Sequence, residues 1–360
     1  MASPSFASLF DLRPVPSPSS SSSTPTYTFR LTPPRAIAVA GVDNNSMYGG
    51  YLLAMALKSV ATVARSKGYP DILSMQLDVL AGIPPEEVEI TVEILRSTRR
   101  LCFLRMTTII LSKSSIGLLS QAVAGHLAPL PGAVVVPART IISDRYALAP
   151  HTAAAPSLTN PNAGAGGYAG VVGGALGFTA EEVKRADRMR TFFKITHATE
   201  AVEYVEKVVR NGAEAVRNET WHALDKMPRI IQHPDGVPMD EIAAAFYADH
   251  NALSAIINNM LGPNVPSVTT SISLQFFSRI PPCDFLYMVS DVPVEPLPAG
   301  PAPSLDGKHH VGSVAYLESR LWTPTGELVC FQRQTKMVVS GEVKAGMERQ
   351  LMKALETSKI

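Results

Sequence analysis

The chain has 360 residues, of which 46% are hydrophobic and 18% are charged, and its formal net charge is +1. This length allows two domains of ordinary size or one large domain, and the apolar fraction is high enough to fill a substantial core. Because the charge is nearly balanced and basic residues do not gather with aromatic ones, we expect no nucleic-acid partner, and because no apolar run reaches about 18 residues, we expect no membrane span.

A Pro/Ser-rich stretch dominates the N-terminus, where residues 14–25 read PVPSPSSSSSTP. This composition predicts a disordered leader over residues 1–26, without the charged start and apolar block of a secretory signal. A mitochondrial transit peptide is the alternative interpretation, but basic residues are sparse here and Asp11 adds an acid.

An N-terminal domain is predicted over residues 27–126. Residues 27–31 alternate enough for an edge strand, and residues 46–68 have the periodicity of a helix, with Ser46 as a candidate cap and Gly68 as the stop. The strands expected to follow as an antiparallel meander are residues 72–80, 87–95 and 101–111.

A second domain with the same plan is predicted over residues 191–340, after an Ala/Gly/Pro-rich linker at residues 127–190 and before a C-terminal tail at residues 341–360. Its helix is expected at residues 239–260, and its strands at residues 267–277, 284–292, 309–321 and 327–339. A helix followed by strands therefore occurs twice, which predicts an α+β fold of two tandem units that share one interface.

The three cysteines, Cys102, Cys283 and Cys330, lie far apart in or beside apolar runs. They form no CxxC pair and have no histidines at ligand spacing. This pattern predicts buried thiols in a reducing compartment, with neither a disulfide framework nor a metal site.

An acid interrupts the apolar face of the predicted helix at residues 239–260. Asp249 lies three residues after Phe246 and four before Leu253, within that face. A buried carboxylate must be paired, hydrogen-bonded or protonated, since burial without a partner costs several kcal/mol. Asp249 is therefore a candidate general base, and the alternatives are a partly exposed acid at the edge of the face or a structural hydrogen-bond hub.

Two strands carry candidate partners for Asp249. On the strand VTTSISLQFF, Thr269 shares a face with Ser271 under simple alternation, and on ELVCFQRQTKMVV, Gln332 and Gln334 lie together. If both strands pack against the helix, Asp249 can accept a proton from a water molecule that Thr269 and Gln334 hold in position. The alternative is that these are ordinary polar faces of half-exposed strands.

These motifs resemble, in order and spacing, the acyl-CoA thioesterase II family and its thioesterase-like relatives, whose chains contain two fused hotdog domains. The resemblance covers most of residues 27–340. The segments that carry it are MYGGYLLAMAL, LSMQLDVLAGIPPEEVEITVEILRSTRRLCFLRMTTIIL, RNETWHAL, FYADHNAL and GELVCFQRQTKM. It implies a double hotdog, in which each domain is a long helix packed against an antiparallel sheet.

The resemblance also implies a site and a reaction. The catalytic Asp, Thr or Ser, and Gln of the family correspond to Asp249, Thr269 and Gln334, although a small shift would select Thr270 or Ser271. Water would attack an acyl-CoA thioester, so coenzyme A enters as part of the substrate and no cofactor is expected. Hotdog enzymes polarise the carbonyl with amides at a helix N-terminus, which would be Tyr48, Gly49 and Gly50 as substrate-binding residues. A homo-oligomer is implied as well.

Two departures from the family pattern keep other functions open. Arg96, Ser97 and Thr98 replace the usual Arg-Asp-Gly turn, and SISLQFFSRI replaces the usual aromatic and His-bearing strand. The first expectation is hydrolysis of a fatty-acyl or polyketide-type CoA ester. The alternatives are a lyase, dehydratase or cyclase of secondary-metabolite biosynthesis, and a non-catalytic acyl-binding protein.

The last residues, Ser358, Lys359 and Ile360, resemble the Ser-Lys-Leu peroxisomal address with a conservative final change. They lead to the expectation of a peroxisomal location and of a peroxisomal import receptor as a partner. A cytoplasmic location is the alternative.

Overall fold

The computed structural model describes residues 5–16, 24–40, 46–127, 194–197, 229–249, 267–291 and 313–338. The elements of the N-terminal half are β2 (Thr26–Leu31), α1 (Gly49–Ser66), β5 (Asp71–Val79), β6 (Val88–Ser97), β7 (Cys102–Ile110) and β8 (Ser115–Gly125). Those of the C-terminal half are β10 (Arg229–Gln232), α8 (Glu241–Ala248), β11 (Ser267–Phe276), β12 (Phe285–Asp291), β13 (Ser313–Trp322) and β14 (Leu328–Val338). Shorter elements are η1 (Ala7–Phe10), β1 (Arg13–Val15), η2 (Arg35–Ile37), β3 (Ala38–Ala40), β4 (Ser46–Met47), η3 (Leu111–Lys113) and β9 (Lys194–His197).

The two halves repeat one topology within a single sheet. Twelve described strands follow the order β1-β2-β6-β7-β8-β5-β11-β14-β13-β12-β10-β9, and the described pairs are antiparallel. The N-terminal order β2-β6-β7-β8-β5 matches the C-terminal order β10-β12-β13-β14-β11, so the predicted repeat is confirmed. The halves join where β5 pairs with β11, from Ser271 opposite Asp78 to Gln275 opposite Ser74.

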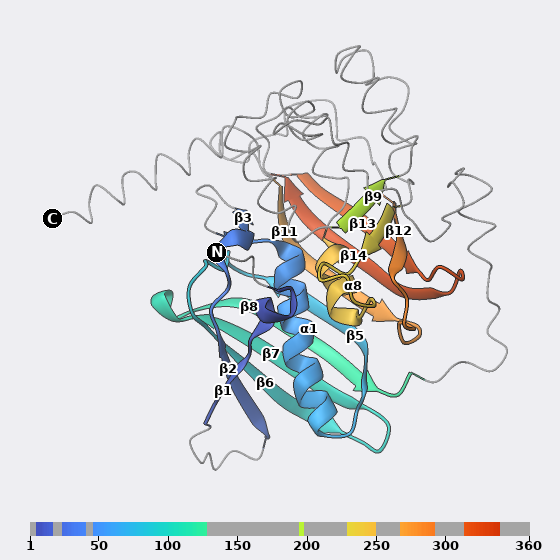
Figure 1. Ribbon diagram of the computed structural model, residues 1–360. Coiled ribbons are helices and arrows are strands. Elements are labelled where there is room, and N and C mark those ends of the chain that lie inside the picture. The colour runs from blue at the N-terminus through green and yellow to red at the C-terminus, as the bar shows by residue number, and fades with distance from the viewer. Residues whose placement is uncertain are drawn as a thin grey trace, which may run out of the picture.

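Both described α-helices lie on the same side of this sheet and contact each other (Figure 1). Helix α1 buries an apolar stripe that includes Leu53, Leu57 and Val60. It ends where Gly68 takes a positive φ of 84°, a conformation that glycine adopts without steric cost. The predicted stop is therefore correct, but Ser46 belongs to β4 and the N-cap position is Tyr48.

The strands of the N-terminal half differ from the predicted meander. Strand β6 alternates between buried and half-buried residues up to Ile94, as its sequence predicts. Strand β8 was not predicted, because SIGLLSQAVAG is rich in Gly, Ala, Ser and Gln, which are weak strand formers. It pairs with both β7 and β5, so β5 lies beside β8 and not beside β6.

Part of the predicted disordered leader over residues 1–26 is ordered, because residues 5–16 and 24–26 are described, whereas residues 1–4 and 17–23 lie outside the described ranges. Phe6, Leu9 and Phe10 are buried in the core around η1. The Phe6 amide donates to Asp235 Oδ1 at 2.8 Å, and the Tyr51 hydroxyl donates to the Leu9 carbonyl at 3.0 Å. Composition indicated disorder because the prolines and serines mask a short apolar cluster that precedes them.

Some of the predictions fall outside the described residues. These are nearly all of the linker, the part of the predicted helix from residue 250 onward, and the tail with Ser358, Lys359 and Ile360. All three cysteines are described and free; Cys102 and Cys330 are buried and Cys283 is half-buried. Burial raises the pKa of the Cys330 thiol to about 12, so this thiol stays protonated at neutral pH. None of the described helices is long and apolar enough to cross a membrane.

Candidate active site

Asp249 lies immediately after the last helical residue of α8, at its C-cap. Asp240 begins this helix as N-cap, with its side chain accepting a hydrogen bond from the Ala243 amide at 2.7 Å. Asp249 itself is only 7% exposed, which rules out the alternative of an exposed acid at the edge of an apolar face. The carboxylate faces the start of α1 and the strands β11 and β14.

Thr269 and Gln334 converge on this carboxylate. The Thr269 hydroxyl donates to Asp249 Oδ1 at 3.2 Å, and Gln334 Nε2 donates to the same oxygen. Gln334 Nε2 also lies 2.8 Å from Thr269 Oγ1, where it donates a hydrogen bond. The structure therefore brings together the three residues that the sequence grouped, from α8, β11 and β14.

A β-bulge turns Thr269 toward the site. The register of β11 against β14 shifts between Thr269 and Ser271, which leaves Thr270 as the extra residue. Under simple alternation Thr269 would share a face with Ser271 and oppose Ile272. Instead, Thr269 reaches Asp249 while Ile272 is also buried in the core. The predicted grouping of faces was therefore wrong at this point, and Thr269, not Thr270 or Ser271, is the residue of β11 that bonds to Asp249.

Gly49 and Gly50 allow the start of α1 to approach the end of α8. A Cβ atom at Gly49 would collide with Asp249 Oδ2, and one at Gly50 would collide with the Phe246 carbonyl. The Gly50 amide donates to Asp249 Oδ2 at 3.2 Å. Helix-to-helix contact thus explains both glycines, and the Gly50 amide, expected to polarise a substrate carbonyl, is directed at Asp249 instead. Tyr48 packs its ring against Phe246, with centroids 5.5 Å apart.

Lys336 is a member of this cluster that the sequence analysis did not identify. Its Nζ lies 3.3 Å from Asp249 Oδ1, and the side chains of Lys336 and Asp249 are only 6% and 5% exposed. The signal was present in the alternation of β14, because Lys336 follows Gln334 by two residues and must share its face. A buried, paired lysine is uncommon enough to be informative.

These contacts keep a negative charge in the interior without an unpaired ion. Oδ1 accepts hydrogen bonds from Thr269 and Gln334 and forms an ion pair with Lys336, and Oδ2 accepts a hydrogen bond from the Gly50 amide. A carboxylate offers about four acceptor positions, so one on Oδ2 remains for a further donor such as water. Within the described ranges no group of histidines, cysteines and acids could hold a metal ion.

A second feature of β14 is a buried amide that the described part of the chain leaves without partners. Gln332 is 1% exposed and shares the inward face with Gln334, and among the described residues neither its Oε1 nor its Nε2 has a hydrogen-bond partner. Its neighbour across the sheet, Ser319, bonds to Ser290 with their Oγ atoms 2.9 Å apart. An orphaned buried amide of this kind lowers stability.

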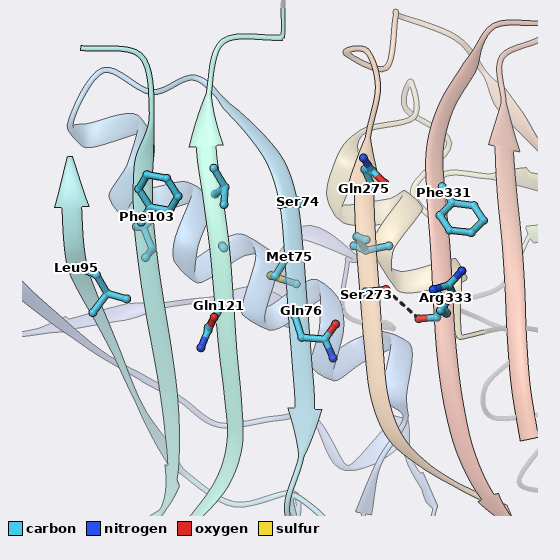
Figure 2. Close-up of a pocket in the computed structure, with 14 residues that line it drawn as sticks. Ser74, Met75, Gln76, Leu95, Phe103, Gln121, Ser273, Gln275, Phe331 and Arg333 are labelled. Atoms are coloured by element: carbon cyan, nitrogen blue, oxygen red, sulfur yellow. Dashed lines mark hydrogen bonds between the residues drawn. The ribbon is translucent and has the colours of Figure 1, made fainter. Parts of the chain in front are cut away.

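A hollow of about 510 Å³ lies on the opposite face of the sheet from Asp249. Figure 2 shows side chains around it from β5, β6, β7, β8, β11 and β14, with the helices behind the strands. Arg333 lines this hollow and precedes Gln334 on β14, so the two side chains leave opposite faces of the strand. The described residues that line the hollow include no carboxylate, and Arg333 is bound to Glu318 at 2.7 Å. The candidate active site is therefore the buried cluster around Asp249.

Comparison with known families and structures agrees with this fold. The acyl-CoA thioesterase N-terminal domain family matches residues 40–125. A candidate thioesterase II from Thermobifida fusca superposes with a TM-score of 0.56 at 15% identity, and the alignment covers 92% of this chain and 97% of that one. A tesB protein of Mycobacterium avium subsp. paratuberculosis gives 0.52 at 14% identity, with 92% and 97% covered.

A candidate thioesterase from Novosphingobium aromaticivorans gives a TM-score of 0.52 at 15% identity, with 88% of this chain and 95% of that one covered. Identities this low establish the fold alone. Comparison with curated protein sequences finds no match.

Proposed function

We propose that this chain hydrolyses an acyl-CoA thioester. The premise is that residues 40–125 match an acyl-CoA thioesterase N-terminal domain and that the fold is like that of thioesterase II-type hotdog proteins. The substrate class is a fatty-acyl or polyketide-type CoA ester. One observation carries the proposal: a carboxylate, a hydroxyl and an amide from three separate elements meet in one buried cluster.

The chemistry assigned to these residues is general-base catalysis. Asp249 accepts a proton from water as the water oxygen attacks the thioester carbonyl carbon. Thr269 and Gln334 fix the orientation of the carboxylate and of the water, which lowers the entropic cost of reaching the transition state. The tetrahedral intermediate then collapses, the carbon–sulfur bond breaks, and the thiolate of coenzyme A takes up the proton.

The test is thiol release from a chain-length series of acyl-CoA esters. The wild-type protein is compared with Asp249→Asn, which keeps the shape of the side chain but cannot take the proton. We expect the substitution to lower kcat/KM by at least about 30-fold, equivalent to about 2 kcal/mol of transition-state stabilisation.

Asp240→Asn is the matched control, because Asp240 is an exposed acid at the other end of the same helix. Asn caps a helix as well as Asp, so this variant should keep both its fold and its turnover. Full turnover in Asp249→Asn would show that Asp249 is not the general base.

Other outcomes identify the alternative chemistries. A rearranged product detected by mass spectrometry, without free acid and thiol, would indicate a lyase, dehydratase or cyclase that uses Asp249 on a carbon acid. Tight binding of acyl-CoA without turnover would indicate an acyl-binding protein. Either result from a folded wild-type protein would replace hydrolysis as the function.

A further inference from the structure

The ion pair between Lys336 and Asp249 makes the candidate site electrically neutral. The two side chains are almost completely buried and the Nζ atom lies 3.3 Å from Oδ1. Lys336 is also the register partner of Thr269 across β11 and β14, so two strands fix it at the site. Burial of an ammonium group costs several kcal/mol, so a buried lysine at this position calls for an explanation.

Proton transfer to Asp249 changes the charge that Lys336 faces. Before the reaction the ammonium is balanced by the carboxylate. Once Asp249 has accepted a proton it is neutral, and the negative charge of the system resides on the oxygen of the tetrahedral intermediate. A buried ammonium without an anion is strongly unfavourable, so its attraction transfers to this oxygen.

We propose that Lys336 is a catalytic residue whose ammonium group stabilises the oxyanion of the thioester, an inference that rests on the proposed hydrolysis. The bond from the water oxygen to the carbonyl carbon forms while the π electrons move onto the carbonyl oxygen. When the carbonyl re-forms, the electron pair of the carbon–sulfur bond leaves with sulfur. Lys336 keeps its proton throughout and faces an anion at each stage.

Two further observations favour this role. The Gly50 amide at the start of α1 donates to Asp249 Oδ2, so this helix-terminal donor already serves the carboxylate, and Lys336 adds a charged donor beside it. An ammonium has three N–H groups, and among the described residues Asp249 is the partner of Lys336. Its remaining donors are therefore available to a substrate oxygen.

The neighbouring elements bring few other charges to this pair. Within the described residues, no second acid or base forms an ion pair with Asp249 or Lys336. Besides Lys336, the groups that contact the carboxylate from α1, β11 and β14 are the neutral Gly50, Thr269 and Gln334. The titratable groups at the start of α1 are the phenols of Tyr48 and Tyr51, and that of Tyr51 donates to the Leu9 carbonyl. The pH dependence of a Lys336 variant is therefore compared directly with that of the wild type.

The experiment measures kcat for thiol release between pH 6 and pH 9 in the wild type and in Lys336→Met. Loss of an oxyanion donor lowers kcat by roughly 10²- to 10³-fold. If Lys336 stabilises the oxyanion, the limiting kcat of Lys336→Met stays low at every pH. If Lys336 only keeps Asp249 ionised, the lost rate returns as the pH rises and Asp249 ionises without it, and this result would overturn the proposal.

Additional variants keep the test decisive. Lys113→Met removes an exposed lysine on η3 and should leave kcat unchanged. If Lys336→Met does not fold, Lys336→Arg and Lys336→Gln are compared, because only Arg keeps the charge; equal kcat values in these two variants would contradict the proposal. A wild type that hydrolyses no ester overturns both proposals, whereas an active wild type with full recovery in Lys336→Met at high pH overturns only the role of Lys336.

Discussion

Removing either member of the buried ion pair should destabilise the fold, and removing both should not. In Asp249→Asn the ammonium of Lys336 stays buried without an anion, and in Lys336→Met the carboxylate stays buried without a cation. Because both side chains are at most 6% exposed, solvent cannot compensate for the missing charge. Each single substitution is expected to lower the free energy of unfolding by about 3–5 kcal/mol.

The double variant Asp249→Asn/Lys336→Met contains no buried charge at this position. The asparagine side chain that it introduces would still accept hydrogen bonds from Thr269 and Gln334 through its carbonyl oxygen, and the apolar methionine side chain has nearly the length of lysine. Independent losses would add to roughly 6–10 kcal/mol, whereas replacement of a buried pair by neutral groups is often close to neutral. We therefore expect the double variant to be more stable than either single variant.

Urea unfolding followed by tryptophan fluorescence measures these differences, because Trp322, one of the two tryptophans, is buried on β13. The slope of the free energy against urea must stay the same in all four proteins for the comparison to hold. Additive losses in the double variant would show that the two charges do not depend on each other, and an Asp249→Asn variant as stable as the wild type would refute the reasoning.

Other substitutions test other parts of the fold. Burial acts to raise the pKa of Asp71, but the hydrogen bonds and charge of Arg279 lower it overall. The ionised carboxylate therefore stabilises the fold above its ordinary pKa, and this stability is lost as the pH falls through the lower folded pKa. Between pH 6 and pH 2 the urea midpoint should fall less steeply in Asp71→Asn than in the wild type, and parallel curves would contradict this. Gln332→Met removes a buried amide that has no hydrogen-bond partner among the described residues, and it should raise the free energy of unfolding by about 1–3 kcal/mol; a decrease would contradict this. Gly50→Ala should lower the free energy of unfolding by about 1–3 kcal/mol, because the new Cβ collides with the Phe246 carbonyl and this outweighs the better helix propensity of alanine. Unchanged thermal stability would contradict that contact.

Local periodicity was enough to predict much of this fold. Strand β6 alternates residue by residue, and α1 and the strands of the C-terminal half lie close to their predicted positions. Strand β8 was not predicted because its stability comes from pairing with β5 and β7 and not from its own strand propensity. The packing of Phe6 and Phe10 depends on contacts with residues far along the chain, which no local pattern contains.

Three members of the cluster were predicted from the sequence, whereas its fourth member, Lys336, and its geometry were not. An acid within an apolar face identified Asp249, and polar positions on two later strands identified Thr269 and Gln334. The bulge at Thr270 could not be read from the sequence, because alternation assumes an unbroken register. Lys336 was overlooked because a lysine near the end of a strand is usually solvated, and only the tertiary structure reveals its burial.

The internal repeat has a consequence for stoichiometry. Asp249 stands eight residues after Glu241, the first residue of α8, and the residue eight positions after Gly49, the first residue of α1, is the buried Leu57. The C-terminal helix thus contributes a carboxylate where the N-terminal helix contributes a hydrocarbon side chain, while the N-terminal helix supplies the Gly50 amide that holds that carboxylate. Both halves therefore contribute to the cluster around Asp249. On the proposed hydrolysis, we expect each chain to bind one acyl group at a time.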